Sequence, residues 1–208
     1  GQALVAAYRT VEKGTCHSLH AYFLRPGDPR APILYQVDRI RDGRSFTTRR
    51  SQAIQHGRAI FHMSASFQPE EDGPEHQASM PEVPEPESLQ SWEEWIAGQP
   101  LPEEVRRHVS RERPFEMRWV DPVNPFAPTK RAPRQQIWIR ARGPLPDEPF
   151  YHQCTVAYVS DMPLIDTAVM PHGIAWTDDC HQMASLDHAM WFHRPCRADQ
   201  WLLYDQQS

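Results

Sequence analysis

Residues 33–67 read ILYQVDRIRDGRSFTTRRSQAIQHGRAIFHMSASF, and this stretch decides the fold of the first part of the chain. Three runs within it are rich in β-branched and aromatic residues, which is typical of strands. They cover residues 33–40, 45–54 and 59–67. Asp42-Gly43 and His56-Gly57 separate them, and such pairs supply the positive φ that tight hairpin turns require. The sequence therefore predicts an antiparallel meander of three strands.

The segment before this meander has the pattern of a helix followed by a strand. In residues 2–11, QALVAAYRTV, the apolar positions Leu4, Val5, Tyr8 and Val11 have helical spacing. This spacing predicts a helix that is largely buried against a sheet. Residues 18–24 form a fourth β-type run.

Residues 69–133 are rich in proline and in acidic side chains. Such a composition does not build a core of its own, so we expect a linker. Two short helices are predicted in it, at 92–97 and 102–109. Its aromatic residues indicate that the linker is partly held on a neighbouring surface; they are Trp92, Trp95, Trp119 and Phe126.

After the predicted linker, residues 135–142 have the two-residue periodicity that predicts a strand. A helix at 147–161 and strands at 183–192 and 201–205 follow. The order of a helix and then strands repeats that of the first part, which favours an internal duplication. The predicted domains are therefore residues 1–68, a linker at 69–133 and residues 134–208.

Composition excludes several functional classes. Of the 208 residues, 27 are acidic and 22 basic, a formal net charge of −5, so no basic excess points to nucleic acid. No run of about 18 apolar residues is present, so we expect no membrane span. The four cysteines are far apart, which favours a reduced, cytoplasmic location. The chain starts within a helical pattern, so we expect both ends to lie inside a longer protein and any targeting signal to be out of view.

Asp161 is the first candidate for chemistry, because it ends the predicted helix in the run Val159-Ser160-Asp161-Met162-Pro163. The helix macrodipole disfavours a negative charge at this end. Such a position suits a general base or a group that orients water. A turn-forming Ser-Asp pair before the proline is the alternative.

Ser185 is the second candidate, in the run MASLDHAMWFHRP at 183–195. As a strand, this run places Ser185, Asp187 and Trp191 on one face and His188 on the other. Polar residues in an aromatic setting suggest the wall of a site, and ordinary cross-strand hydrogen bonding is the alternative. Adjacent strand residues point apart, so we expect no local Ser-Asp-His triad here.

Cys16, His17 and His20 resemble a metal-ligand cluster in spacing. In a strand, however, positions 17 and 20 face opposite sides, so we expect no metal. His17 is instead a candidate pocket residue, with a satisfied core or edge histidine as the alternative. Glycine-rich nucleotide loops, a G-x-S-x-G elbow and H-E-x-x-H are absent from the sequence.

Together, several segments of the sequence resemble acyl-CoA thioesterase II, the TesB family. They are HSLHAYFLRPGDPRAPILY (17–35), VDRIRDGRSFTTRR (37–50), AIQHGRAIFHMSASFQ (53–68), YVSDMPLIDTAVMPHG (158–173) and ASLDHAMWFHRPCRADQWLLYDQ (184–206). The resemblance covers nearly the whole chain outside the linker. It implies an α+β double hotdog, in which two antiparallel sheets each wrap around a long helix, incomplete here at both ends.

The resemblance also implies an activity: hydrolysis of fatty acyl-CoA by a water molecule that an Asp, a Ser or Thr and a Gln hold, without cofactor or metal. By motif, the Asp falls on Asp161 and the hydroxyl residue on Ser185. The Gln of the family's Q-E-G segment has no counterpart before Ser208. A dimer or tetramer is expected, in the cytoplasm or, in a eukaryote, the peroxisome.

Substrate contacts are expected from two further groups. Tyr158, Met162 and Trp191 are candidates for an apolar tunnel that takes the acyl chain. Arg49 and Arg194 are candidates for the CoA phosphates. Two alternatives stay open: a hotdog hydratase, whose G-D-x-N-P-x-H pattern the sequence lacks, and a non-catalytic hotdog that binds acyl-CoA or forms oligomers.

Overall fold

The computed structural model describes residues 1–101, 103–109, 111 and 113–208. These residues form two units, which we describe separately. Unit 1 consists of residues 1–76, 146–161 and 184–196, and unit 2 of residues 77–145, 162–183 and 197–208.

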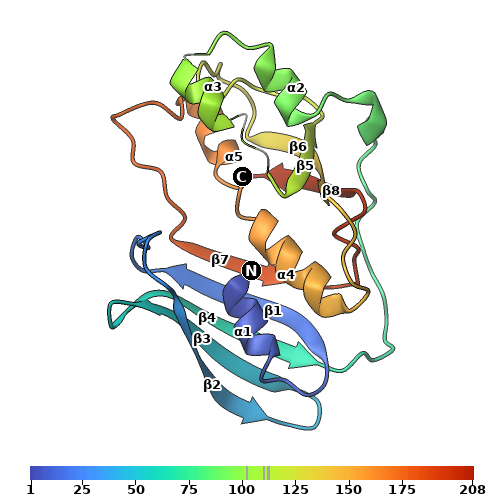
Figure 1. Cartoon of the computed structure of the whole chain (residues 1–208). Helices are drawn as coiled ribbons and strands as arrows, with labels where there is room; N and C mark the ends of the chain where they lie inside the picture. Colours follow the sequence, from blue (N-terminus) through green and yellow to red (C-terminus); the bar gives the residue numbers. More distant parts are fainter. Residues whose placement is uncertain (102, 110, 112) are drawn as a thin grey trace. The chain divides into compact units, whose positions relative to one another are not determined.

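Unit 1 is built on a five-stranded antiparallel sheet with the strand order β2-β3-β4-β1-β7 (Figure 1). The strands are β1 (Thr15–Phe23), β2 (Leu34–Asp42), β3 (Thr47–Gln55), β4 (Arg58–Gln68) and β7 (Asp187–Trp191). The meander of β2, β3 and β4 confirms the predicted one. β7 comes from the far end of the sequence and pairs with β1, where Ser18 opposes Trp191.

The two hairpin turns of the meander differ from each other. His56 and Gly57 have φ values of 49° and 72°, as a two-residue turn with the twist of a hairpin requires, and Gln55 pairs with Arg58 on either side. Gly43 lies outside the positive-φ region, contrary to our prediction, and its N–H donates to the carbonyl of Phe46 instead. A wider loop therefore replaces the predicted tight turn at Asp42-Gly43.

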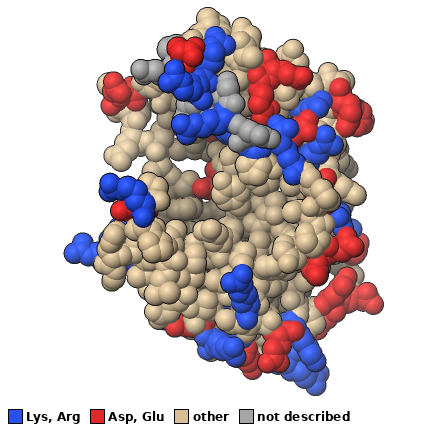
Figure 2. Space-filling view, viewed as in Figure 1, with Lys and Arg blue, Asp and Glu red and all other residues tan. Residues whose placement is uncertain are grey.

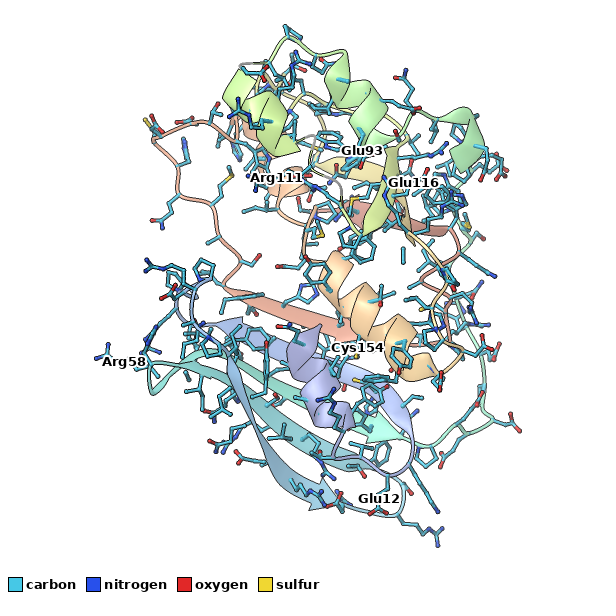
Figure 3. All side chains as sticks on the ribbon, in the orientation of Figure 1. Glu12, Arg58, Glu93, Arg111, Glu116 and Cys154 are labelled. Atoms are coloured by element: carbon cyan, nitrogen blue, oxygen red, sulfur yellow. The ribbon has the colours of Figure 1, made fainter. Side chains whose placement is uncertain are left out.

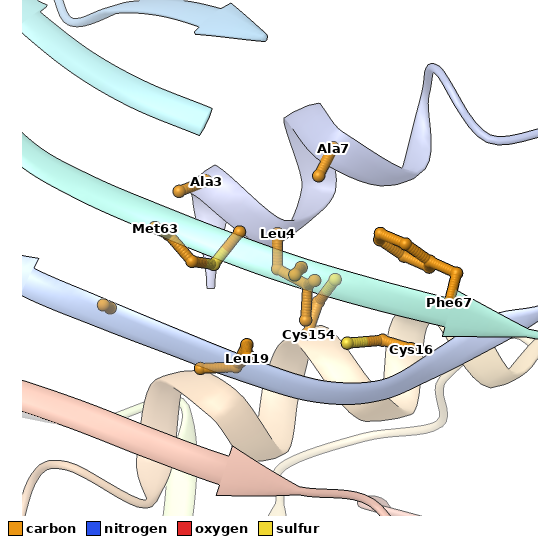
Figure 4. Close-up of a cluster of buried hydrophobic side chains, with 10 residues drawn as sticks. Ala3, Leu4, Ala7, Cys16, Leu19, Met63, Phe67 and Cys154 are labelled. Carbon is orange, nitrogen blue, oxygen red and sulfur yellow. The ribbon is translucent and has the colours of Figure 1, made fainter. Parts of the chain in front are cut away.

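The core of unit 1 lies between the sheet and two helices, α1 (Gln2–Tyr8) and α4 (Pro149–Val159). Leu4 of α1 and Phe67 of β4 are 1% and 0% exposed, and Cys154 of α4 joins them (Figure 4). At about 25 cal/mol per Å² of buried apolar area, such packing is the main stabilising term of the unit. Helix α1 is shorter than the predicted 2–11, because the chain turns away after Tyr8.

A buried network of hydrogen bonds also joins the elements of this core. The hydroxyl of Tyr8 donates to Oε1 of Gln153, and the backbone N–H of Cys16 donates to the Tyr8 hydroxyl at 2.7 Å. Nε2 of Gln153 completes the network by donating to the Cys16 carbonyl at 2.9 Å. These bonds join α1, β1 and α4, and a satisfied network of this kind specifies one arrangement of the three elements.

Unit 2 contains a three-stranded antiparallel sheet with the order β5-β6-β8. Its strands are β5 (Phe115–Trp119), β6 (Arg134–Ala141) and β8 (Leu202–Gln207). Its helices are η1 (Pro86–Ser88), α2 (Trp92–Ala97), α3 (Glu103–Val109), α5 (Asp166–Val169) and η2 (Met170–His172). The predicted helix at 92–97 is confirmed. Pro102, the predicted start of the next helix, lies outside the described residues.

The segment that we predicted to be a linker supplies much of the core of unit 2. Ile96, Phe115 and Met117 are at most 5% exposed and come from this segment. β5, which we did not predict, carries Glu116 (Figure 3). Its carboxylate accepts hydrogen bonds from Arg118 and Arg140. Pro-rich residues are held on the unit as expected, since Trp138 donates to the carbonyl of Pro84 at 3.0 Å.

Two segments belong to a different unit from the predicted one. The helix predicted at 147–161 is α4, and the strand predicted at 183–192 is β7, which begins only at Asp187. We had placed both in the domain 134–208. α4 packs on α1 and β1, and β7 pairs with β1, so both belong to unit 1.

Charged side chains of both signs are interspersed over the face shown in Figure 2. None of the helices in the described part of the chain is long and apolar enough to span a membrane.

Candidate active site

The candidate site in unit 1 forms where α4 ends and the chain enters β7. α4 ends at Val159 with Ser160 as its C-cap, and Asp161 follows directly. Ser185 lies two residues before β7, and its hydroxyl donates to Oδ1 of Asp161 at 2.9 Å. The structure thus brings together the two residues that we predicted from separate motifs. The Asp161 side chain is 28% exposed, so solvent reaches it.

The hydrogen bonds of this pair leave specific atoms available. Oδ1 of Asp161 is occupied by the Ser185 hydroxyl, whereas Oδ2 makes no hydrogen bond with any described residue. The Ser185 oxygen donates its one proton and keeps lone pairs that accept. A carboxylate oxygen and a hydroxyl oxygen are therefore both available as acceptors beside each other, which is the arrangement that holds the two protons of one water molecule.

His188 lies against the same carboxylate. Its Nδ1 is 3.6 Å from Oδ1 of Asp161, and its Nε2 is 3.0 Å from the hydroxyl oxygen of Ser160. The imidazole is 9% exposed. Burial lowers the pKa of His188 below 6.5, opposed by the negative charge of Asp161, so the ring is neutral at pH 7.

Our prediction for the faces of this strand was wrong at Ser185. The alternation of faces applies only within a strand, and β7 begins at Asp187, after Ser185. The irregular backbone of residues 184–186 therefore lets Ser185 and His188 approach the same carboxylate. From the sequence, His188 was considered only as a member of a local Ser-Asp-His triad and was placed on the face opposite Ser185, and Ser160 only as part of a turn-forming Ser-Asp pair.

Two of the predicted tunnel residues are exposed. Tyr158 on α4 is 52% exposed and Trp191 at the end of β7 is 63% exposed. They remain accessible to an acyl chain but do not form a closed tunnel by themselves. Met162, the third, belongs to unit 2 and is half-buried there.

The two candidate arginines for CoA phosphates differ sharply. Arg49 is 1% exposed, and its guanidinium donates to Thr10, Arg41, Thr48 and Asp42. Because its donors are used inside unit 1, our prediction of a phosphate contact at Arg49 is not supported. The Arg194 side chain is 51% exposed and forms an ion pair with Glu75 at 2.9 Å. Surface pairs of this type are worth roughly 0–1 kcal/mol, so Arg194 can exchange its partner.

The three residues of the metal-like motif do not converge. Nε2 of His17 is 2.8 Å from the hydroxyl oxygen of Ser66, while Nε2 of His20 is 2.9 Å from Oδ2 of Asp187. Cys16 is buried and its thiol donates to the carbonyl of Ser18. No group of three or more potential ligands with suitable geometry occurs in residues 1–101, 103–109, 111 and 113–208. His17 is thus a hydrogen-bonded strand histidine, half-buried beside Phe46.

Comparisons with known proteins place these residues in a family. The family model described as "Acyl-CoA thioesterase" matches residues 105–208, and that of the "Acyl-CoA thioesterase N-terminal domain" matches residues 1–68. Human acyl-coenzyme A thioesterase 8 is 44% identical over the whole chain, which covers 68% of that protein. Acyl-CoA thioesterase 2 of Haemophilus influenzae is 40% identical over the whole chain, which covers 73% of it.

Solved structures agree with these sequence matches. An acyl-CoA thioesterase II, TesB2, from Mycobacterium marinum superimposes with a TM-score of 0.75 at 44% identity, over 98% of this chain and 72% of that one. A protein with a hot dog fold from Alicyclobacillus acidocaldarius gives a TM-score of 0.67 at 17% identity, over 93% and 67%. The predicted α+β hotdog fold is thereby confirmed. This chain belongs to the acyl-CoA thioesterase family of thioester hydrolases.

Proposed function

We propose that the protein hydrolyses fatty acyl-CoA to a free fatty acid and CoA, with Asp161 as general base and Ser185 as a second contact of the attacking water. The observation that carries the proposal is the 2.9 Å hydrogen bond from Ser185 to Oδ1 of Asp161, which leaves Oδ2 unoccupied by described residues. The names of the relatives support the substrate class.

Each proton in the proposed step has a donor and an acceptor. The water donates one proton to Oδ2 of Asp161 and the other to the oxygen of Ser185, whose own proton is donated to Oδ1. A lone pair of the water is then free to attack the thioester carbonyl carbon while Asp161 takes the first proton. The tetrahedral intermediate expels CoA as a thiolate, which receives that proton from Asp161. No covalent enzyme intermediate forms and no cofactor takes part.

The main contribution of Asp161 and Ser185 in this proposal is to orient the attacking water. A thioester carbonyl has less resonance stabilisation than that of an oxygen ester, so a well-placed water with a base is a sufficient nucleophile. General-base catalysis of this kind contributes about 10²–10⁴-fold in rate. The family resemblance adds a Gln as a third contact of the water.

Substrate binding is proposed to use Arg194 for a CoA phosphate and the exposed Tyr158 and Trp191 for the acyl chain. Arg194 supports this role because its pair with Glu75 is on the surface and exchangeable. We also propose that the protein is a homo-oligomer, a dimer or tetramer. Its support is the edge strand β2, on which Leu34 and Ile40 are 65% and 56% exposed.

Turnover of decanoyl-CoA by the full-length protein, followed as thiol release with a thiol-reactive dye, tests the activity. We expect saturable hydrolysis. Saturable binding of the acyl-CoA without thiol release would instead identify a non-catalytic acyl-CoA binding protein.

A single-turnover reaction in H₂¹⁸O, with enzyme in excess, tests the direct attack of water. Direct attack places ¹⁸O in the fatty acid in the first turnover. If Asp161 were itself the nucleophile and water opened the mixed anhydride at the aspartyl carbon, the first fatty acid would carry ¹⁶O from the enzyme. An ¹⁶O product would therefore contradict the general-base role.

A further inference from the structure

His188 has one nitrogen that no hydrogen bond accounts for. Nε2 is 3.0 Å from the Ser160 hydroxyl, but the buried Nδ1 has no hydrogen-bond partner among the described residues. The group that Nδ1 faces is Oδ1 of Asp161, at 3.6 Å. A buried imidazole nitrogen without a partner is costly and calls for an explanation.

We propose that His188 is a positioning residue for the hydrolysis, whose Nδ1–H holds Oδ1 of Asp161 so that Oδ2 is presented to the water. This inference rests on the proposed function of Asp161. At 3.6 Å the contact is slightly longer than a hydrogen bond. Catalytic contacts are often long in the absence of substrate and tighten in the complex. A movement of a few tenths of an ångström completes it.

Ser160 selects the required tautomer. If its hydroxyl donates to Nε2, that nitrogen is an acceptor and the single ring proton of a neutral imidazole is on Nδ1. The Nδ1–H then points at Asp161. The Ser160 oxygen also lies 3.3 Å from the sulfur of Met190, a much weaker acceptor than an imidazole nitrogen. Of these two acceptors, Nε2 of His188 is therefore the stronger.

Burial keeps the His188 ring neutral, against the effect of the carboxylates around it. The carboxylate of Asp161 comes from the end of α4, and that of Asp187 from β7. His20 of β1 hydrogen-bonds Asp187 and so draws that carboxylate toward itself. Burial is the largest influence on the pKa of His188 and lowers it. A neutral His188 ring can donate a hydrogen bond to Asp161. It does so without forming a full ion pair, which would neutralise the negative charge of this base.

Ser160, His188 and Asp161 have the connectivity of a serine-hydrolase triad, so a nucleophilic Ser160 is the rival interpretation. Ser160 is 8% exposed at the C-cap of α4, next in the chain to Asp161. A nucleophile must reach the substrate carbonyl, and the exposed group of the three is Asp161. The geometry thus favours a chain of contacts that orients the base.

Two conservative variants separate the positioning role from a structural one. In His188→Asn, the amide N–H overlays Nδ1 and keeps the donor to Asp161; in His188→Gln, the amide overlays Nε2 and loses it. We expect His188→Asn to retain kcat/KM within about threefold. For His188→Gln we expect a fall of about 10- to 100-fold, since a hydrogen bond to a charged group is lost.

The pH profile of kcat/KM is the second readout, because its acid limb reports the base of the free enzyme. Loss of an N–H donor makes protonation of a carboxylate easier, so the limb of His188→Gln moves to higher pH, by about one unit. His188→Asn leaves it in place. Equal losses in the two variants with an unmoved acid limb would show that His188 is only structural and would overturn the inference.

Two further measurements cover the case in which a variant folds poorly. The ¹⁵N chemical shifts of His188 in the wild-type protein are expected to show a proton on Nδ1, and a proton on Nε2 would contradict the proposal. Ser160→Ala is expected to lose only a few-fold in rate, whereas complete loss would support a nucleophilic serine. If hydrolysis does not depend on Asp161, the proposed function fails; if it does and the two His188 variants are alike, only this inference fails.

Discussion

Asp161 and Asp166 are five residues apart in the chain, yet their surroundings give them opposite properties. Asp161 in unit 1 is partly exposed and accepts a hydrogen bond from Ser185. Asp166 in unit 2 lines a cavity of about 50 Å³ with Trp92, Trp119 and Trp176. Burial raises the pKa of Asp166 to about 6. An unusual carboxyl group is thus not in itself a catalytic one: the solvent-accessible, oriented aspartate is the better candidate.

The largest expected effect separates these two residues by activity. Asp161→Asn keeps the shape of the side chain and its contact with Ser185 but removes the base, so we expect kcat to fall by about 10³-fold or more. Asp166→Asn is the matched control and should hydrolyse decanoyl-CoA within about threefold of the wild type. Near-normal turnover by Asp161→Asn, or an equal loss in both variants, would contradict the role of Asp161 as the base.

The second effect concerns the stability of unit 2. The pKa of Asp166 is about 6 in the folded protein and about 3.9 when unfolded, so the folded state binds the proton more tightly. Its stabilising contribution is present below about pH 4 and is lost as the pH rises through about 6. Asp166→Asn carries no charge and should avoid this loss. We expect it to gain up to about 3 kcal/mol relative to the wild type between pH 4 and pH 7.

Denaturant unfolding at several pH values measures this difference. Asp161→Asn, measured in the same way, is the control for a general effect of replacing an aspartate. A pH-independent difference between Asp166→Asn and the wild type would show that the carboxyl group is already ionised at pH 4, and that its surroundings are more polar than the structure indicates.

Local signals made the meander of unit 1 predictable. Turns such as His56-Gly57 bring neighbouring runs together, so the register of β3 and β4 follows from residues a few positions apart. β5 was missed for a different reason. Phe115, Met117 and Trp119 alternate as in a strand, but the Pro-rich and acidic residues before them led us to predict a linker. This alternation was the signal in the sequence from which β5 could have been predicted.

The candidate site was predictable only in part. Asp161 and Ser185 were found by their motifs, but the approach of His188 to Asp161 depends on where β7 begins and on its pairing with β1, far away in the sequence. Arg49 shows the same limit. An arginine within a strand is usually exposed, and its burial here depends on acceptors such as Thr10 and Asp42, which non-local packing brings to it.

A smaller effect sharpens the role of the partner of Asp161. Ser185→Ala removes one contact of the water and one donor to Oδ1, while the base remains, so we expect kcat to fall by about 10- to 100-fold. Ser185→Thr keeps the hydroxyl and should retain most of the activity. Thiol release from decanoyl-CoA measures both. A Ser185→Thr variant as slow as Ser185→Ala would indicate that packing at this position, and not the hydroxyl, sets the rate.

The smallest effect concerns a neighbour of Asp166. The indole of Trp176 lines the same cavity as Asp166 and lowers the pKa of this carboxyl group against the effect of burial. Trp176→Phe removes the indole N–H, so the pKa of Asp166 should rise further, and the variant should lose more stability at pH 7 than at pH 4. Because Trp176 is 47% exposed, solvent replaces part of this effect and the difference should be about 0.5–1 kcal/mol. Trp95→Phe is the control, since the Trp95 ring contacts Trp92 and its loss should cost the same at both pH values. If the two variants show the same pH dependence, Trp176 does not act on Asp166, and burial alone accounts for the contrast between the two aspartates.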